Sequence, residues 1–396
     1  MPTGPGHTLG AMPVAYLPDL LADVPRPRVL ELGGRRVTPD PWQCPSHWQR
    51  TGVDVRPGPG VDLVADAHEL SRQLPADSFD ALWSHAVFEH LAMPWLVALE
   101  MNRVLKTGGL AWIVTHEAFP VHEWPSDFWR FGPGAWEGLF SPATGFEILG
   151  SRPLQQARVV PDADPGAAYP GHPGCEVQLR KRGPPDPCLR WQLRAHELLG
   201  GQIYPGLLRR SVARGRRGVI KLAQRAGYRP RPRPSPDDPW RLFEGAERWH
   251  LLAGPRAREL PGERLAYDGS IQAALTDVPD ASLPALALLD VLQREPRPWA
   301  AVRHARRVLA PGGRLFVDSC QVAPADEPCW RLSSAAMPVL FHRASGFSLR
   351  RAEMLDPCHM LGDGFTGTEV QRAYGRTLGL AVAAGPWDHE ALAWEA

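Results

Sequence analysis

The stretch RVLELGG, residues 28–34, decides the fold expected for this chain. Its first five residues are mostly apolar, and two glycines follow them directly. A short apolar run that ends in glycine is typical of a buried parallel strand followed by a tight turn. The sequence therefore predicts that an α/β sheet begins here.

Further strands and a helix follow in alternation. The strands are expected at residues 51–55, 61–67, within 79–91 and at 110–116. PWLVALEMNRVL, residues 94–105, has helical spacing and stops at Lys106-Thr107-Gly108-Gly109, with the basic charge and glycine typical of a helix C-terminus. Strands that alternate with helices predict a mostly parallel sheet with helices on both faces.

Composition limits the class of protein. The 396 residues suffice for two domains of ordinary size, and 44% hydrophobic with 22% charged residues predicts a folded chain. The net charge of +1 gives no reason to expect a nucleic acid or an anionic membrane as partner. No apolar run approaches the roughly 20 residues that span a bilayer.

The expected compartment is the cytoplasm. The N-terminus MPTGPGHTLG lacks the basic and apolar regions of a secretion signal. The 6 cysteines contain no CxxC spacing, so we expect free thiols rather than a disulfide framework or a zinc site.

The chain repeats one pattern. PWAAVRHARRVLAPGGRLFVDSC, residues 298–320, aligns without a gap with PWLVALEMNRVLKTGGLAWIVTH, residues 94–116. Further along, Trp330-Arg331 aligns with Trp129-Arg130. Self-similarity of this kind predicts a duplicated domain, and chance matching of short apolar strings does not account for 23 ungapped residues.

We therefore expect an α/β protein with two tandem Rossmann-like domains. The predicted domains are residues 1–182 and 241–396, and residues 183–240 join them as basic helices and a proline-rich linker. The basic helices are expected to be a solvated connector rather than a surface for an anionic partner.

Acidic residues follow the glycine turn at the ends of successive expected strands. Asp54 lies 23 residues after Glu31, where a carboxylate can accept from ribose hydroxyls. Asp66 ends the third expected strand, and Ser84 follows the fourth. Each residue alone has an ordinary structural explanation, but the order and spacing of the set favour a cofactor site.

With these motifs, residues 28–146 resemble the class I S-adenosylmethionine-dependent methyltransferases that modify small molecules and glycans. The resemblance implies a seven-stranded, mostly parallel sheet and S-adenosylmethionine as the cofactor. It also implies that the ELGG turn receives the methionine part and that the acid after the third strand accepts from adenine. The implied cofactor-binding residues are Glu31, Gly33, Gly34, Asp54, Val55, Asp66, Ala67, Ser84 and His85.

The glycine turn disfavours a nicotinamide dinucleotide. Such cofactors need G-x-G-x-x-G to seat a pyrophosphate on a helix N-terminus. Here the turn reads GGRRVTPDP, and Pro39 and Pro41 disturb the start of a helix. The longer glycine pattern of the methyltransferases is also truncated, but a site without a phosphate cradle suits a cofactor without phosphates.

The acceptor side is predicted in THEAFPVHEWPSDFWRF, residues 115–131. Methyl transfer to a hydroxyl or an amine needs a base, and His116 or His122 is expected in that role, oriented by Glu123 or Asp127. His85 is a further catalytic candidate. A metal site of His116, His122, Glu123 and Asp127 is chemically conceivable, but the spacing matches no familiar ligand pattern and we predict none.

The second copy has lost these groups. Leu252 stands in place of Glu31, and Pro255 in place of Gly34 removes a backbone N–H. Only 14 residues separate Gly254 from Asp268, against 33 between Gly33 and Asp66, so the ribose acceptor is missing. We expect this degenerate copy to mimic the second subunit of a dimer or to cover the acceptor site.

The predicted function is transfer of a methyl group from S-adenosylmethionine to an oxygen or nitrogen of a small molecule, sugar or peptide-like metabolite. The chain is expected to act as a monomer or homodimer. The alternative is a non-catalytic scaffold or regulatory protein. Nucleic acid methylation would rest on the basic residues 190–233, but no Asn-Pro-Pro-Tyr-type motif accompanies them.

Overall fold

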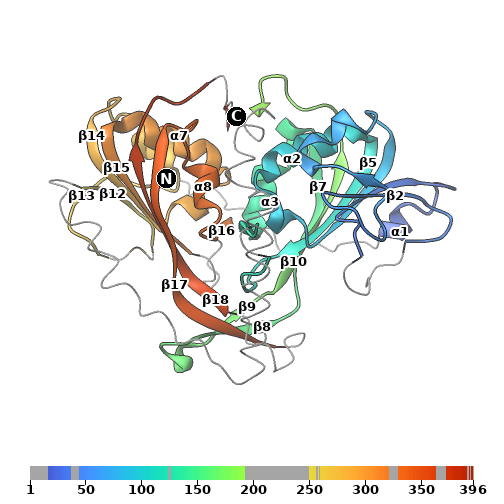
Figure 1. Cartoon of the computed structure of the whole chain (residues 1–396), viewed down its shortest axis with the longest axis horizontal. Coiled ribbons are helices and arrows are strands. Elements are labelled where there is room, and N and C mark those ends of the chain that lie inside the picture. The colour runs from blue at the N-terminus through green and yellow to red at the C-terminus, as the bar shows by residue number, and fades with distance from the viewer. Residues whose placement is uncertain are drawn as a thin grey trace, which may run out of the picture.

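A computed structural model places the chain around two β-sheets that lie side by side (Figure 1). It describes residues 17–36, 44–123, 126–191, 249–255, 257, 259–320, 329–362, 372–389, 392 and 394–395. Most of the expected linker, residues 192–240, and Pro39 and Pro41 lie outside the described residues.

The first sheet has 7 strands in the order β3-β2-β1-β4-β5-β10-β7. All neighbouring pairs are parallel except those that β10 makes with β5 and β7. The strands are β1 (Arg28–Leu32), β2 (Gln49–Asp54), β3 (Leu63–Val64), β4 (Phe79–His85), β5 (Leu105–His116), β7 (Phe146–Leu154) and β10 (Gly174–Lys181). The α/β architecture expected from the ELGG stretch is therefore confirmed.

Helices cover both faces of this sheet. Leu17 of α1 (Leu17–Leu20) packs on one face with Val29 of β1. The opposite face packs against α2 (Pro94–Val104) and α3 (Pro133–Leu139), which point toward the second half of the chain (Figure 1). Short 3₁₀ turns complete this half: η1 (Ala67–Arg72), η2 (Phe88–His90), η3 (Pro142–Thr144) and η4 (Pro165–Ala167).

The second sheet has 8 strands in the order β13-β12-β14-β15-β18-β17-β8-β9. Its strands from the second half are β12 (His250–Ala253), β13 (Glu263–Arg264), β14 (Leu283–Leu289), β15 (Leu309–Cys320), β17 (Phe347–Gly362) and β18 (Arg372–Ala383). The hairpin β8 (Ala157–Pro161) and β9 (Tyr169–Gly171) comes from the first half and pairs with the far end of β17 (Figure 1). The helical segments of this half are α6 (Ile271–Leu275), η6 (Leu292–Arg294), α7 (Pro298–Val308) and α8 (Met337–Leu340).

Several element boundaries differ from the expected ones. The second strand, expected at residues 51–55, is Gln49–Asp54. The third strand was expected at residues 61–67 but is only Leu63–Val64, because Asp66 caps the turn η1 by accepting from the His68 backbone N–H. The helix ends at Val104 as expected, but β5 begins directly at Leu105 instead of at residue 110. The basic residue and glycines after the helix therefore belong to the start of a strand.

The two halves share one continuous core. At the seam, β6 (Trp129–Phe131) pairs antiparallel with β16 (Trp330–Leu332), and Arg130 lies opposite Arg331. Trp95 stacks on Trp299 with ring centroids 4.4 Å apart. A short pair of strands, β11 (Arg190–Trp191) and β19 (Trp394–Glu395), forms a second link.

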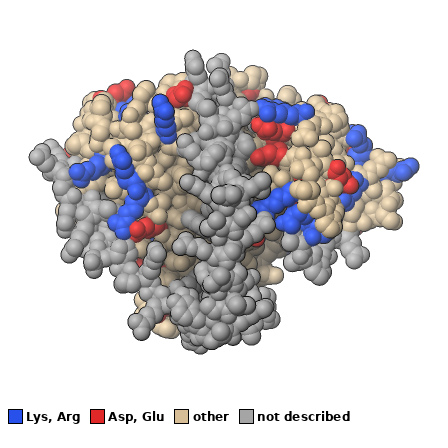
Figure 2. Space-filling model, viewed as in Figure 1, with Lys and Arg blue, Asp and Glu red and all other residues tan. Residues whose placement is uncertain are grey.

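The visible surface carries no single large charged area. Lys and Arg side chains form small separate groups interspersed with Asp and Glu on the described part of the face in Figure 2. This mixture agrees with the net charge of +1. Among the described residues, the structure has no helix that is long and apolar enough to cross a membrane.

Glu295, beside the seam, makes stability depend on pH. Burial raises the pKa of Glu295 to about 7, with further repulsion from Asp268, although the Ile271 N–H offsets part of the effect. A pKa raised by folding gives a contribution that is present below the unfolded pKa and is lost as pH rises through 7. The free energy of unfolding of Glu295→Gln minus that of the wild type, measured in urea, should be about 2 kcal/mol larger at pH 8 than at pH 5. A difference that is equal at both pH values would contradict this account.

Candidate active site

A cavity of about 740 Å³ opens where β1, β2, β4 and β5 end. Ligands bind at the carboxyl ends of parallel strands in open α/β sheets. Ten of the expected site residues line the cavity: Glu31, Gly33, Asp54, Val55, Asp66, Ala67, His85, His116, His122 and Glu123. The expected site residues Gly34, Ser84 and Asp127 are not part of its wall.

The glycine turn serves a steric purpose. Gly33 has φ +76°, and a Cβ at this position would lie 2.3 Å from Val87 Cγ2. The N–H groups of Gly33 and Gly34 both donate to the Val53 carbonyl, at 2.8 and 3.0 Å. These N–H groups are therefore bound to the neighbouring strand, and what the turn contributes to the cavity is its small size.

Glu31 is tied to two arginines. Its carboxylate is buried and accepts hydrogen bonds from Arg36 and Arg50. Arg50 also reaches Asp62, at 3.2 Å. Glu31 therefore holds the segment after the turn in place, and this ion pair shapes the cavity wall.

The acids after β2 and β3 meet at one end of the cavity. Asp54 Oδ1 accepts from the Arg56 N–H at 2.8 Å, and Arg35 Nε lies 4.0 Å from the same atom. Among the described residues, no protein donor contacts Asp54 Oδ2, which suits a carboxylate that accepts from a bound hydroxyl. One oxygen of Asp66 already contacts the protein, because its Oδ1 lies 2.6 Å from His68 Nδ1.

The other end of the cavity holds a cluster of histidines around Glu89. Glu89 is fully buried, and its Oε2 accepts from Thr115 Oγ1 at 2.5 Å. Its Oε1 lies 3.1 Å from His116 Nε2 and 3.8 Å from the Nε2 atoms of both His90 and His122. Burial would raise the pKa of Glu89, but the three imidazoles outweigh it and hold the pKa well below its usual range.

The two expected bases differ in their surroundings. Burial lowers the pKa of His116, and Glu89 offsets this only in part. Burial would also lower the pKa of His122, but Asp127 outweighs burial and raises it. The pKa of His116 therefore lies below that of an ordinary imidazole, and the pKa of His122 lies above it.

Asp127 lies behind this cluster. It is fully buried, binds Arg130 through both carboxylate oxygens, and accepts from the His122 backbone N–H at 2.8 Å. Its Oδ2 also lies 3.3 Å from His122 Nδ1. Burial opposes its ionisation, but Arg130 and His122 hold the pKa of Asp127 well below its ordinary value.

The remaining expected residues have other surroundings. His85 is exposed and stacks on Trp83 at 6.0 Å, and Glu123 is exposed with φ +48°. Ser84 is fully buried, and its Oγ has no hydrogen-bond partner among the described residues.

The sequence analysis missed Glu89 and His90 as site residues. In the sequence, Phe88-Glu89-His90 stands between an expected strand and an expected helix, where a structural role is as reasonable as a catalytic one. These residues form η2 in the connection between β4 and α2. Only the fold shows that this connection lies against the loop after β5.

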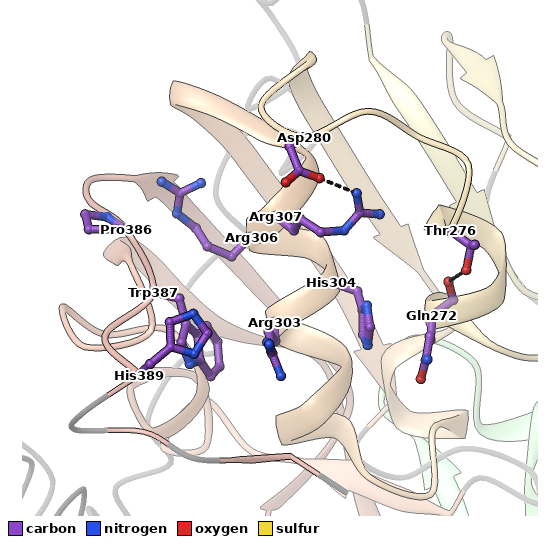
Figure 3. Close-up of a pocket in the computed structure, with 10 residues that line it drawn as sticks. All are labelled: Gln272, Thr276, Asp280, Arg303, His304, Arg306, Arg307, Pro386, Trp387 and His389. Atoms are coloured by element: carbon purple, nitrogen blue, oxygen red, sulfur yellow. Dashed lines mark hydrogen bonds and ion pairs between the residues drawn. The ribbon is translucent and has the colours of Figure 1, made fainter.

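A second hollow of about 580 Å³ lies in the C-terminal half, beside α7 (Figure 3). Its arginines have structural partners. Arg306 donates to the Gly346, Gly385 and Leu309 carbonyls, and Arg307 donates to the Val278 and Leu275 carbonyls and to Asp280. These contacts bind the end of α7 to the loops around it.

Comparison with known proteins agrees with this geometry. Residues 44–113 match the model of a family described as a methyltransferase domain. No curated protein matches the chain.

Solved structures of similar fold include the YcgJ protein from Bacillus subtilis (15% identity, 40% of this chain and 93% of that one, TM-score 0.28). Another is a SAM-dependent methyltransferase from Archaeoglobus fulgidus (13% identity, 39% of this chain and 86% of that one, TM-score 0.30). A third is the Burkholderia thailandensis 1,6-didemethyltoxoflavin-N1-methyltransferase with bound S-adenosylhomocysteine (16% identity, 42% of this chain and 76% of that one, TM-score 0.28).

The family match covers β2, β3, β4 and most of β5, and it includes the wall residues between Val53 and Leu91. Residues 44–113, in the N-terminal half of the chain, thus match a methyltransferase domain.

Proposed function

We propose that the protein transfers the methyl group of S-adenosylmethionine to an oxygen or nitrogen atom of a small molecule, sugar or peptide-like metabolite. The observation that carries the proposal is the single cavity that runs from Asp54 and Asp66 to His116 and His122. A cofactor bound at the first end would point its reactive part toward the second. The cavity volume lies within the range of small-molecule sites, roughly 300–1,000 Å³.

The cofactor end is proposed to be built as follows. Asp54 accepts from the ribose hydroxyls, with Val55 beside it, and Asp66 with Ala67 contacts the adenine. Gly33 and Gly34 keep the turn small, and Glu31 holds the segment after it. Ser84 and His85 stand at the end of β4, where His85 lines the cavity and Ser84 is buried behind it.

The acceptor end supplies the groups for proton removal. When bound, S-adenosylmethionine supplies an electrophilic methyl group on its sulfonium sulfur. As the acceptor oxygen or nitrogen bonds to the methyl carbon, the sulfur keeps the electrons of the broken bond and the acceptor loses a proton. His116 and His122 are proposed to assist this loss, and Glu89 and Asp127 position their rings. Glu123 and His85 remain candidates at the rim.

We further propose that residues 241–396 are a degenerate copy of the domain in residues 1–182, joined to it by residues 183–240. Strands β13-β12-β14-β15-β18-β17 repeat the order of the first sheet with one strand fewer. Local details repeat as well. Ser319 Oγ contacts Gln293 Oε1 at 3.1 Å, as Thr115 contacts Glu89.

The role proposed for this copy is to support the acceptor loop. Arg331 donates to the Glu117 carbonyl at 3.3 Å, and Ser333 donates through its hydroxyl to the Asp127 carbonyl. The Ser333 N–H also binds the Phe128 carbonyl, at 3.0 Å. These contacts support the proposal that the C-terminal half takes the place of a second subunit.

Calorimetry with S-adenosylhomocysteine tests the proposal. The wild type should bind, and Asp54→Ala should weaken binding by about 10- to 100-fold, because hydrogen bonds to a charged group contribute about 1.5–3 kcal/mol. Asp80→Ala is the matched control, since Asp80 lies at the opposite end of β4 and pairs with Lys106. Labelled S-adenosylmethionine with a panel of hydroxyl- and amine-bearing compounds then identifies the acceptor. A wild type that binds no S-adenosylhomocysteine would favour the non-catalytic scaffold.

A further inference from the structure

The cluster around Glu89 has the chemistry of a metal site. Ligand atoms of Glu89, His116 and His122 all lie within 4.8 Å of one another. Two imidazoles and one carboxylate suit several divalent transition-metal ions, including those that keep open positions for a substrate. Ligand atoms around a tetrahedral ion with bonds near 2.0–2.1 Å are about 3.3 Å apart. Small side-chain rotations would bring the three ligand atoms to this spacing.

A second observation points to a ligand here. Glu89 Oε1 is buried and meets no hydrogen-bond criterion with any described group, although its partner oxygen accepts from Thr115. The nearest polar neighbours of Oε1 are imidazole nitrogens, at 3.1 Å from His116 and 3.8 Å from His90 and His122. A buried carboxylate oxygen that faces several imidazole nitrogens has the donor set of a divalent-metal site. His116 and His122 flank this oxygen and line the cavity.

The surroundings also resemble those of metal-bound histidines. A ligating histidine usually gives its other ring nitrogen to a carboxylate or a carbonyl. His122 has Nε2 toward Glu89 and Nδ1 3.3 Å from Asp127 Oδ2. Asp127 is fixed in turn by Arg130. This arrangement would hold the His122 ring in one orientation for a metal.

The C-terminal half shows that the fold does not need these ligands. Its backbone repeats the local geometry, since Ala86 and Asp290 have φ +53° and +57°. The alignment of 94–116 with 298–320 places Cys320 at the position of His116, and continuing it five residues upstream without a gap places Gln293 at the position of Glu89. There Arg294 pairs with Asp290 at 2.9 Å.

We propose that Glu89, His116 and His122 bind a divalent transition-metal ion whose open coordination positions face the cavity. This inference rests on the proposed function in one respect: the ion would bind the oxygen or nitrogen of the methyl acceptor and lower its pKa. The two imidazoles would then serve as ligands, and the acceptor's proton would pass to water or to His90 at the edge of the cluster.

Co²⁺ binding tests the site directly. Chelator-treated full-length protein is dialysed against Co²⁺, and bound metal is read by elemental analysis and by visible absorption. We expect one Co²⁺ per chain. Glu89→Gln and His116→Asn should each weaken binding by more than the roughly 10- to 100-fold that loss of an outer partner costs.

The controls distinguish loss of the metal site from unfolding of the variant and from failure of the proposed function. Glu89→Gln copies the glutamine found at position 293, so it should fold, as checked by circular dichroism. His250→Asn removes a histidine of another His–Glu pair, 3.6 Å from Glu263, and should leave Co²⁺ binding unchanged. Binding that survives Glu89→Gln and His116→Asn, or a wild type that binds no Co²⁺, would overturn the metal site. S-adenosylhomocysteine affinity, measured on the same samples, tests the proposed function independently.

Discussion

Asp127→Asn is expected to lower the free energy of unfolding by about 3–5 kcal/mol, because it removes one partner of a fully buried ion pair. Arg130 would stay buried with its charge and lose the carboxylate that binds two of its nitrogens. Urea unfolding monitored by tryptophan fluorescence measures the loss. The substitution is nearly isosteric, so the effect reports charge rather than volume.

An exposed pair provides the control for this measurement. Asp80 binds Lys106 at 2.5 Å, but the lysine side chain is 43% exposed. Exposed pairs contribute about 0–1 kcal/mol, so Asp80→Asn should have little effect. Equal losses for Asp127→Asn and Asp80→Asn would show that the buried pair is not a determinant of stability. The role of Asp127 would then be limited to positioning His122.

Trp299→Ala is expected to destabilise the whole chain by about 3–5 kcal/mol, as for other large-to-small changes of buried aromatic residues. Trp299 is fully buried and stacks on Trp95 across the seam, and Trp129 and Trp330 lie edge to face 5.6 Å apart beside them. Both halves contribute to this cluster. The unfolding transition should therefore shift as one step, without a separate transition for either half.

A double-mutant cycle sharpens the test. Trp95→Ala, Trp299→Ala and the double variant should show a coupling of about 0.5–1.5 kcal/mol, because the two rings contact each other. Purely additive losses, or two separate unfolding transitions, would argue that the halves fold independently. In that case the C-terminal half could not support the acceptor loop in the way proposed.

Part of the candidate site was predictable because it follows local rules. Gly33 and Asp54 are placed by strand ends, and strand ends can be read from apolar runs bounded by glycine and acids. His116 was placed in the same way at the end of β5. Comparison of the two copies then separated Trp129-Arg130, which the structure buries at the seam, from His116 and His122, which line the cavity.

Other features could not be read from the chain. Glu31 was expected at the cofactor, but its carboxylate is bound by Arg36 and Arg50, and Arg50 lies 19 residues away on the next strand. Glu89 was overlooked because its partner His116 is 27 residues further on. Such pairings depend on which loops meet, and sequence spacing does not encode that.

By itself, the sequence determined the α/β class, the ELGG turn, the order of the acids and the repeat in the second half. These features depend on local periodicity and on the steric needs of single residues. Only the tertiary structure decided that the halves share one core, that β8 and β9 join the second sheet, and that Glu89 meets His116 and His122. The reason is physical: burial and ion pairing act between surfaces, and those surfaces exist only once the strands have been ordered in the sheets.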